Sequence, residues 1–483
     1  MAVVAGVDSS TQSCKVELRE SATGQLLGSG QAPHPPTTPP VSEQDPAAWW
    51  QALKVAFAEA CDRADTPPGA VRAIAIAAQC HGLVLQGADG QVLRPAKLWN
   101  DLTSAPQAKA MVRDTGSAFW AQAVGSVPTA AFTITKLAWM AEHEPAILAE
   151  AARACLPHDY LTWKLTGRSV TDRSEASGTG YYASHEGRYR TDLLQEFGGA
   201  GGLALPEVLG PAEFAGYASG AAAELGLPAD AVVGPGAGDQ HAGALGIGIG
   251  PGDLLFSLGT SGVTMTVTDH SVHDPTGWVD GVSDATGRYL PLVCTLNATK
   301  VTDWFRSILG VSFAEFDELA LSVAPSERTL TLAAFFDGER TPDLPRAVGI
   351  LGGLTTASTR AQLARAAVDG VAMGLLEGVD GIVRCGADVG GRVVVTGGGA
   401  HSAAYRQSLA DFLGRPVVVA DTGDAAARGA CLQAAAVLAG ACVDHVKEQW
   451  RPAELAVTEP GDQVPSQVRR LYRELASYRQ VDR

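Results

Sequence analysis

Several features that define common classes of protein are missing from this sequence. Its eight cysteines lie far apart in the 483 residues and form no CxxC pair, so we expect neither a disulfide framework nor a zinc site. No run of about 18 apolar residues is present, and the opening MAVVAGVDSS has no basic segment before an apolar one. These absences predict a protein with reduced thiols in the cytoplasm, without a membrane span or a signal peptide.

Positive charge is also scarce. The 36 lysine and arginine residues face 52 acidic ones, which gives a formal net charge of −16. Because nucleic acids and anionic membranes are bound through basic patches, neither is expected as a partner. The GxxxxGK[ST] phosphate loop is absent, and so is the early GxGxxG fingerprint of a NAD-dependent dehydrogenase. A phosphate ligand would therefore be bound locally, by backbone N–H groups and a metal ion.

Two similar strand–turn–strand patterns organise what is present. VVAGVDSSTQSCKVELRE (residues 3–20) and GDLLFSLGTSGVTMTVT (252–268) each contain a short polar turn between apolar runs. A helical stretch opened by Asp45 leads into the apolar run 70–79, which is typical of a strand buried on both faces. The pattern predicts an α/β protein of two similar domains, residues 1–240 and 241–483, that face one cleft.

The segment GPGAGDQHAGALGIG (234–248) contains six glycines and a single acid, Asp239. It fits a flexible surface loop, where glycine is common. It also fits a backbone that approaches a ligand closely, with Asp239 aimed at that ligand and the glycines keeping space clear around it. The segment alone leaves both interpretations open.

Three turns that follow strands could bind phosphates or a nucleoside. The first contains Asp8, Ser10, Thr11 and Gln12, and the second contains Gly259, Thr260 and Ser261. The third contains Gly397, Gly398 and Gly399, with Ala400 and Ser402 behind them. It is expected to open a helix whose N–H groups attract anions or the ring and sugar of a nucleotide. Alternatively, the three glycines only end a strand. Together the turns indicate an ATP site without a P-loop, as in sugar kinases and in ATPases of the actin and chaperone kind.

Within that architecture the chain resembles the FGGY carbohydrate kinases, from residue 3 to about residue 440. The matching stretches are GVDSSTQSCK, QCHG, LWND, PHDYLTWKLTG, TDRSEASGT, GDQHAGALGIG, FSLGTSG, GERTP and VVVTGGGAHSAAYRQSLADFLGRPV. The resemblance implies two actin-like (ribonuclease H-like) domains around a central cleft, with ATP and Mg²⁺ as cofactors. It makes Asp239 the base that takes the proton from the attacking sugar hydroxyl. It also places Asp8 and Asp239 at the metal, Asp8 mostly through waters, while Thr11 and Thr260 donate to phosphates and Lys15 could add charge.

On the sugar side, QCHG and LRPAKLWND look most like the xylulokinases. The resemblance implies sugar contacts from Cys80, His81, Trp99, Asn100, Asp101, Asp239 and Gln240. Three departures put the exact sugar in doubt: Cys80 where methionine is common, Gln240 after the base, and His241 in place of a small residue. The expected reaction is phosphorylation of a ketopentose, with D-xylulose as the best match. The alternatives are D-ribulose, a glycerol-like polyol, or an ATP-binding conformational protein without an acceptor, and a homodimer is one expectation for assembly.

Overall fold

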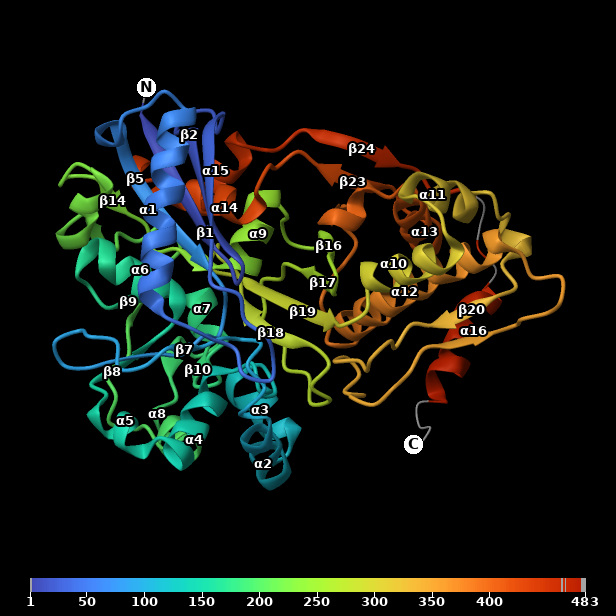
Figure 1. Ribbon diagram of the computed structural model, residues 1–483, viewed down its shortest axis with the longest axis horizontal. Helices are drawn as coiled ribbons and strands as arrows, with labels where there is room; N and C mark the ends of the chain where they lie inside the picture. The colour runs from blue at the N-terminus through green and yellow to red at the C-terminus, as the bar shows by residue number, and fades with distance from the viewer. Residues whose placement is uncertain (1, 462–463, 465, 479–483) are drawn as a thin grey trace.

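Two seven-stranded sheets, one in each lobe, form the framework of the computed structural model, which describes residues 2–461, 464 and 466–478 (Figure 1). The first has the order β13-β14-β5-β1-β2-β3, with β15 beside β5, and the second has the order β18-β19-β17-β16-β22-β23-β24. The first-sheet strands are β1 (Val3–Ser9), β2 (Ser13–Glu20), β3 (Leu26–Pro33), β5 (Val71–Ala78), β13 (Gly216–Tyr217), β14 (Val232–Val233) and β15 (Ala237–Gly238). The second-sheet strands are β16 (Leu254–Leu258), β17 (Gly262–Thr266), β18 (Asp280–Ser283), β19 (Tyr289–Thr295), β22 (Val393–Thr396), β23 (Val417–Ala420) and β24 (Glu454–Thr458).

The two predicted hairpins lie at matching places in the two sheets. β1 pairs antiparallel with β2 and parallel with β5, while β16 pairs antiparallel with β17 and parallel with β22. The helix expected behind Asp45 is α1 (Pro46–Arg63), and the Asp45 side chain accepts a hydrogen bond from Ala47 N, which caps it. The predicted α/β class with two domains is confirmed, whereas the boundary at residue 240 stays a prediction.

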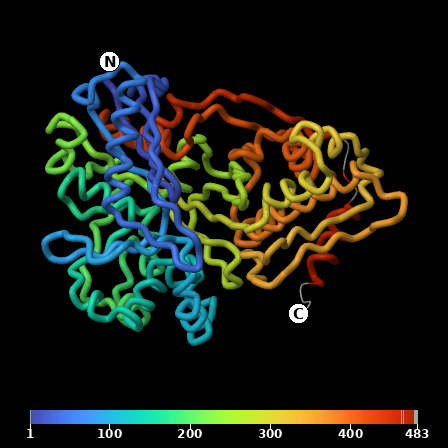
Figure 2. The backbone as a smooth tube through the Cα atoms, in the orientation of Figure 1, coloured from blue at the N-terminus to red at the C-terminus, as the bar shows by residue number. Residues whose placement is uncertain are grey.

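The two faces of β5 carry side chains of different size. Ile74 and Ile76 belong to a core that also contains residues of α1 and α6 (Pro157–Thr166). The alanines between them pack instead against α14 (Ala425–Ala439). At Gly6 on β1, an added Cβ would lie 2.0 Å from the Ala427 carbonyl oxygen. Small residues on this face therefore let a helix from far along the chain lie directly on the first sheet (Figure 2).

Helix α9 (Asp239–Ile247) connects the cores of the two lobes. Ala242 and Leu245 pack in the cluster under the first sheet, whereas Ala244 and Ile247 pack with Leu255 of the second. At Gly246, an added Cβ would lie 1.9 Å from the Ala425 carbonyl oxygen, so α9 also touches α14 closely. Asp239, the first residue of α9, is therefore held where the lobes join.

The remaining helices cover the sheets or extend the lobes. The first lobe also carries α2 (Ala105–Thr115), α3 (Ser117–Val124), α4 (Thr133–His143), α5 (Pro145–Glu150), α7 (Arg173–Ser177) and α8 (Thr191–Gly198). The later part of the chain adds α10 (Thr299–Leu309), α11 (Phe313–Leu321), α12 (Arg360–Arg384), α13 (Ala403–Leu413), α15 (Val443–Gln449) and α16 (Ser466–Ser477). Within the described ranges, no single helix is long and apolar enough to cross a membrane. The pair α14 and α15 passes that test only together, bent by 116°.

Candidate active site

Asp8 lies near the end of β1, and its carboxylate is buried. Its Oδ1 has no hydrogen-bond partner among the described residues, and its Oδ2 is 3.7 Å from Lys15 Nζ. Burial, followed by the charges of Asp424 and Asp239, raises the pKa of Asp8 well above its usual value, although Lys15 opposes the shift. A carboxylate among other carboxylates is stabilised when a cation approaches it, so this end of β1 suits a cation.

Asp239 presents its carboxylate from the first turn of α9. Oδ1 accepts hydrogen bonds from Gln240 N at 2.7 Å and from the Cys80 thiol at 3.5 Å. Among the described residues, no side chain or backbone group donates to Oδ2. Burial raises the pKa of Asp239 to about 6, and the two hydrogen bonds only partly oppose that shift. One carboxylate oxygen is thus held by the protein while the other is free to accept a proton near neutral pH.

His81 has a tightly fixed ring beside this carboxylate region. Its backbone has φ +65, a left-handed conformation that few residues other than glycine adopt. Its Nδ1 lies 2.7 Å from the Gly178 carbonyl oxygen, which can only accept, so Nδ1 carries the proton and Nε2 is an acceptor. The ring stacks on Phe132 with centroids 5.0 Å apart. Burial, followed by the charge of Lys136, lowers the pKa of His81 to about 3, so the ring is neutral.

The last three residues of the LWND segment have different surroundings. Trp99 is 39% exposed, and its Nε1 donates to Thr11 Oγ1 at 2.8 Å, which joins the expected sugar segment to the first phosphate turn. Asn100 has a buried Oδ1 without a partner among the described residues. Asp101 departs from the expectation, because it is fully buried and its carboxylate accepts from Ser42 N and Thr103 N. Those protein donors give Asp101 a structural role instead of a free oxygen for a sugar hydroxyl.

The glycines around Asp239 differ from the expectation that they leave open space. An added Cβ at Gly236 would lie 2.1 Å from His158 Nε2, and one at Gly238 would lie 2.5 Å from Cys80 Sγ. At these positions glycine permits close packing of neighbouring groups. Gly243, where an added Cβ would meet nothing within 4 Å, is the member of the segment that does face open space.

The second and third turns come together in the second lobe. Residues 259–261 follow β16 and residues 397–399 follow β22, its parallel neighbour. Thr299, the first residue of α10, donates its hydroxyl to the Gly259 carbonyl oxygen at 2.9 Å. An added Cβ at Gly399 would lie 3.0 Å from Thr299 Cγ2, so both turns and the start of α10 form one surface. Thr260, Ser261, Gly397 and Gly398 are exposed on it, whereas Gly399 and Ala400 are buried.

The helix behind the third turn is not a free anion site. A 3₁₀ turn, Gly398–His401, separates the glycines from α13, which begins at Ala403. Ser402 caps α13, and its hydroxyl donates to Asp317 Oδ1 at 2.6 Å, while Ala403 N donates to Asp317 Oδ2 at 2.8 Å. A carboxylate of the protein already occupies this helix N-terminus, so of the two expected ligands, an anion or the ring and sugar of a nucleotide, an anion is disfavoured there.

The predicted residues thus form two groups, one in each lobe. Asp8, Ser10, Thr11, Gln12, Cys80, His81, Trp99, Asn100, Asp239 and Gln240 lie in the first lobe or at its junction with the second, and the other turns lie in the second lobe. Among the described residues, no hydrogen bond or ion pair links the two groups. This arrangement fits a site whose sugar side and nucleotide side belong to different lobes.

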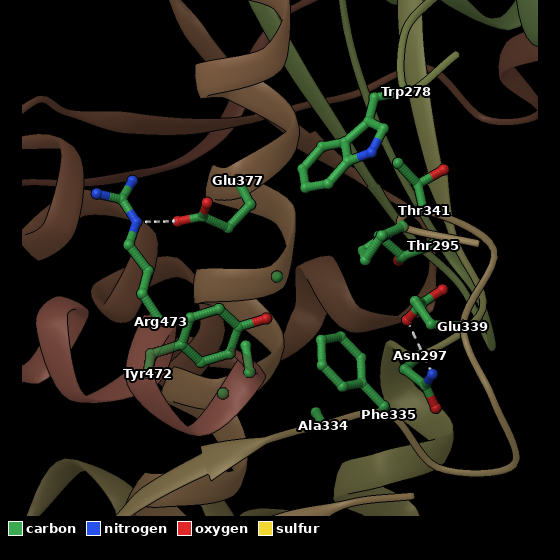
Figure 3. Close-up of a pocket in the computed structure, with 14 residues that line it drawn as sticks. Trp278, Thr295, Asn297, Ala334, Phe335, Glu339, Thr341, Glu377, Tyr472 and Arg473 are labelled. Atoms are coloured by element: carbon green, nitrogen blue, oxygen red, sulfur yellow. Dashed lines mark hydrogen bonds and ion pairs between the residues drawn. The ribbon is translucent and has the colours of Figure 1, made fainter. Parts of the chain in front are cut away.

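A cavity of about 260 Å³ lies elsewhere in the second lobe (Figure 3). Trp278, Phe335 and Tyr472 are among its lining residues, and none of the predicted site residues lines it. Both of its acids have protein partners: Glu339 accepts from Leu296 N, Arg340 N and Asn297 Nδ2, and Glu377 forms an ion pair with Arg473 at 2.8 Å. The cavity is therefore not the reaction centre.

Three residues at or near the site were not predicted. Glu175 lies in the quoted stretch TDRSEASGT without an assigned role. Thr299 begins an amphipathic helix, and Asp424 looks like the start of an alanine-rich one. Their positions depend on contacts between distant segments. Only the polar character of Glu175 inside a glycine-, serine- and alanine-rich stretch could have indicated a site residue.

The comparisons with known proteins identify the family of this chain. The model of the FGGY family of carbohydrate kinases matches residues 3–246 with its N-terminal domain and 254–438 with its C-terminal domain. A xylulose kinase of Streptomyces rubiginosus is 42% identical over 458 residues, which cover 95% of this chain and 92% of that protein. The crystal structure of the xylulose kinase from Bifidobacterium adolescentis is 37% identical, with a TM-score of 0.86 over 98% of this chain and 99% of that one. The predicted resemblance is confirmed: the chain belongs to the FGGY family of carbohydrate kinases, and it is an ATP-using sugar kinase.

Proposed function

We propose that this kinase transfers the γ-phosphoryl group of ATP to the 5-hydroxyl of D-xylulose. The observation that carries the proposal is the 42% identity, over 95% of the chain, to a protein named xylulose kinase. The carboxylate of Asp239, with one oxygen held and the other free, supplies the base that the reaction needs.

The chemistry assigned to Asp239 is proton removal. Its Oδ2 accepts the proton of the 5-hydroxyl as that oxygen bonds to the γ-phosphorus. The bond between the γ-phosphorus and the oxygen bridging to the β-phosphate then breaks, which releases ADP. A pKa of about 6 leaves Asp239 mainly ionised at neutral pH yet basic enough to accept a proton. Phosphoryl transfer otherwise depends on alignment and charge neutralisation.

The sugar contacts come from groups that the fold leaves available. His81 Nε2 can accept from a hydroxyl, and Asn100 Oδ1 is buried without a partner among the described residues. Cys80 and Trp99 form walls, and the exposed Gln240 can reach the sugar from α9. Asp101 is left out of this set, since its carboxylate already accepts from the protein.

The phosphate side fits Mg²⁺ and a triphosphate. The free Oδ1 of Asp8 is an oxygen ligand of the kind that Mg²⁺ prefers, and this ion would neutralise phosphate charge during transfer. The described residues contain no group of three or more ligating side chains that could hold a metal, which suits an ion bound largely through waters and phosphates. Backbone N–H groups of residues 11–12 and 260–261 would bind the phosphates, since Ser10 N and Gly259 N already donate within their own turns. The glycine turn 397–399 would bind the nucleoside.

The proposal is tested by ADP release on a panel of D-xylulose, D-ribulose, glycerol and gluconate. We expect the highest kcat/KM for D-xylulose, because an analogue that leaves a buried polar group unpaired loses about 1–3 kcal/mol of binding. If D-ribulose or glycerol exceeded D-xylulose tenfold, the substrate assignment would be wrong. Asp239→Asn should retain ATP binding and lose several orders of magnitude in kcat. A variant with a tenth of wild-type activity would contradict the assignment of the base.

A further inference from the structure

Three polar side chains converge behind the backbone of Asp239. A Cβ added at Gly238 would lie 2.5 Å from Cys80 Sγ, 2.5 Å from Glu175 Oε1 and 2.6 Å from His241 Nδ1. The Cys80 thiol is also 3.9 Å from His241 Nδ1 and donates to Asp239 Oδ1 at 3.5 Å. Cys80 is therefore the member of this cluster that connects it to the catalytic carboxylate.

Glu175 is the least expected member of the cluster. It is 1% exposed, and neither of its oxygens has a hydrogen bond of good geometry to a described residue. Asp172, the N-cap of α7, accepts from Ser174 N and from Glu175 N, so the backbone that carries this side chain is fixed. Ser174 Oγ in turn accepts from Gly238 N at 3.4 Å, which ties α7 to the strand before Asp239.

A buried carboxyl group in this state does not stabilise the fold. Leaving a buried polar group without a partner costs about 1–3 kcal/mol, and an apolar side chain of similar shape avoids that cost. Burial, followed by the charges of Asp159, Asp172 and Asp239, raises the pKa of Glu175 well above its usual value. The raised pKa favours the protonated form, in which the group can donate as well as accept a hydrogen bond.

We propose that Glu175 is a positioning residue for phosphoryl transfer, which orients the Cys80 thiol and through it the carboxylate of Asp239. The thiol has one proton, which it donates to Asp239 Oδ1, so the sulfur keeps its lone pairs for another donor. Glu175 Oε1 is the neighbouring oxygen, since it and the sulfur would each lie 2.5 Å from a Cβ added at Gly238. With Oδ1 held in this way, Oδ2 keeps the direction from which it takes the proton of the sugar hydroxyl. This role rests on the proposed function of Asp239 as the base.

The proposal distinguishes two variants of nearly equal size. Glu175→Gln keeps a donor and an acceptor in the same place and should retain at least a third of wild-type kcat. Glu175→Leu fills the space without polar atoms and should lower kcat tenfold or more. The KM for sugar and for ATP should change less than threefold in both, because Glu175 touches neither substrate. The melting temperature of Glu175→Leu should equal or exceed that of the wild type, since a buried polar group without a partner is removed.

The experiment measures kcat and both KM values of the full-length enzyme on the sugar that the wild type phosphorylates fastest. It includes Glu175→Gln, Glu175→Leu, Cys80→Ala, the double variant Glu175→Leu/Cys80→Ala, and Asp239→Asn. Because Glu175 acts through the thiol, the double variant should have the kcat of Cys80→Ala, not the product of the two single losses. Thermal melting of every variant separates misfolding from a loss of positioning.

Four results would each contradict the positioning role of Glu175. Glu175→Leu with kcat within twofold of the wild type, Glu175→Gln as inactive as Glu175→Leu, a loss confined to KM, or multiplicative losses in the double variant would each overturn the positioning role. If Asp239→Asn remained active, the proposed base itself would be wrong. An inactive Asp239→Asn beside a fully active Glu175→Leu would reject only the inference about Glu175.

Discussion

Lys15 on β2 and Asp424 before α14 form an ion pair of 2.7 Å, although 409 residues separate them in the sequence. Asp424 also caps α14 by accepting from Ala427 N. Burial lowers the pKa of Lys15, but the charge and hydrogen bond of Asp424 and then Asp8 outweigh it, so the net pKa is raised. One carboxylate thus starts a helix that covers the first sheet and holds an ammonium group beside the first phosphate turn.

Replacing Asp424 should affect stability and ATP binding separately. Asp424→Asn keeps an oxygen for the cap but loses the charge that holds Lys15, whereas Asp424→Ala loses both. We expect Asp424→Ala to be less stable than Asp424→Asn by about 1 kcal/mol, measured by urea unfolding. Both variants should raise the KM for ATP by a similar factor. An unchanged KM for ATP in Asp424→Asn would show that Lys15 needs no such partner.

The raised pKa of Asp239 predicts how activity depends on pH. The base must be ionised, so kcat/KM for the sugar should fall about tenfold for each pH unit below about 6. Initial rates measured between about pH 4.5 and about pH 8, at roughly every half pH unit, give the acidic side of this pH–rate profile. A limb centred near the ordinary carboxyl pKa of about 4 would mean that burial does not control this group.

The same raised pKa predicts that, as the pH rises, the contribution of Asp239 to stability falls while activity increases. Since the folded pKa of Asp239 lies above its unfolded value of about 4, the folded state binds more protons between about pH 4 and pH 6. The contribution of Asp239 to the free energy of unfolding therefore falls as the pH rises through that window. Asp239→Asn has no such titrating group, so above pH 6 its free energy of unfolding should be about 1–3 kcal/mol higher than that of the wild type. Urea unfolding at several pH values checks this, and a difference that does not vary with pH would contradict it.

Two glycines of one segment provide a matched pair. Gly238 has φ −65, which any residue adopts, so Gly238→Ala acts only through the contacts of its Cβ with Cys80, Glu175 and His241. We expect a loss of about 1–3 kcal/mol of stability and at least a tenfold loss of kcat, because the cluster beside the base must move. Gly243 lies inside α9, and a Cβ added there would meet nothing within 4 Å. Gly243→Ala should therefore raise the free energy of unfolding by up to about 1 kcal/mol and keep the activity. Equal effects at the two positions would refute the steric argument.

The contact between Trp99 and Thr11 connects the proposed sugar side to the proposed phosphate side. Trp99→Phe removes the N–H that donates to Thr11 Oγ1 and keeps most of the ring. One such hydrogen bond is worth about 1 kcal/mol, so kcat/KM should fall about fivefold. The control is Trp50→Phe on α1, which removes a hydrogen bond to Glu224 and should leave the kinetics unchanged. If both variants behaved alike, Trp99 would have no special role at the site.

Local patterns were sufficient for much of the fold and for part of the site. Alternating apolar residues around short polar turns placed both hairpins, and a proline behind Asp45 placed α1. The single acid among six glycines pointed to Asp239, whose free oxygen at the start of α9 supports that interpretation. These features depend on neighbours in the sequence, which the sequence displays directly.

Features that depend on distant segments were missed or misread. Asp101 was expected to contact the sugar, but Ser42 N, 59 residues away in the sequence, donates to its carboxylate. The glycines at 236 and 238 looked like open space, whereas side chains from residues 80, 158, 175 and 241 fill it. Asp317, which occupies the start of α13, lies 85 residues before Ser402. Propensity and motif spacing carry no information about such contacts.

The helix α14, which covers one face of the first sheet, is synthesised long after the strands of that sheet. β1 and β5 leave the ribosome early, but the helix that covers their alanine-lined face follows several hundred residues later. At ordinary elongation rates, that face waits in water for tens of seconds. Because Gly6 and the alanines of β5 expose less apolar area than leucine or valine would, the waiting surface offers little for another nascent chain to adhere to. Close helix packing in the finished enzyme and resistance to aggregation during its translation thus depend on the same small side chains.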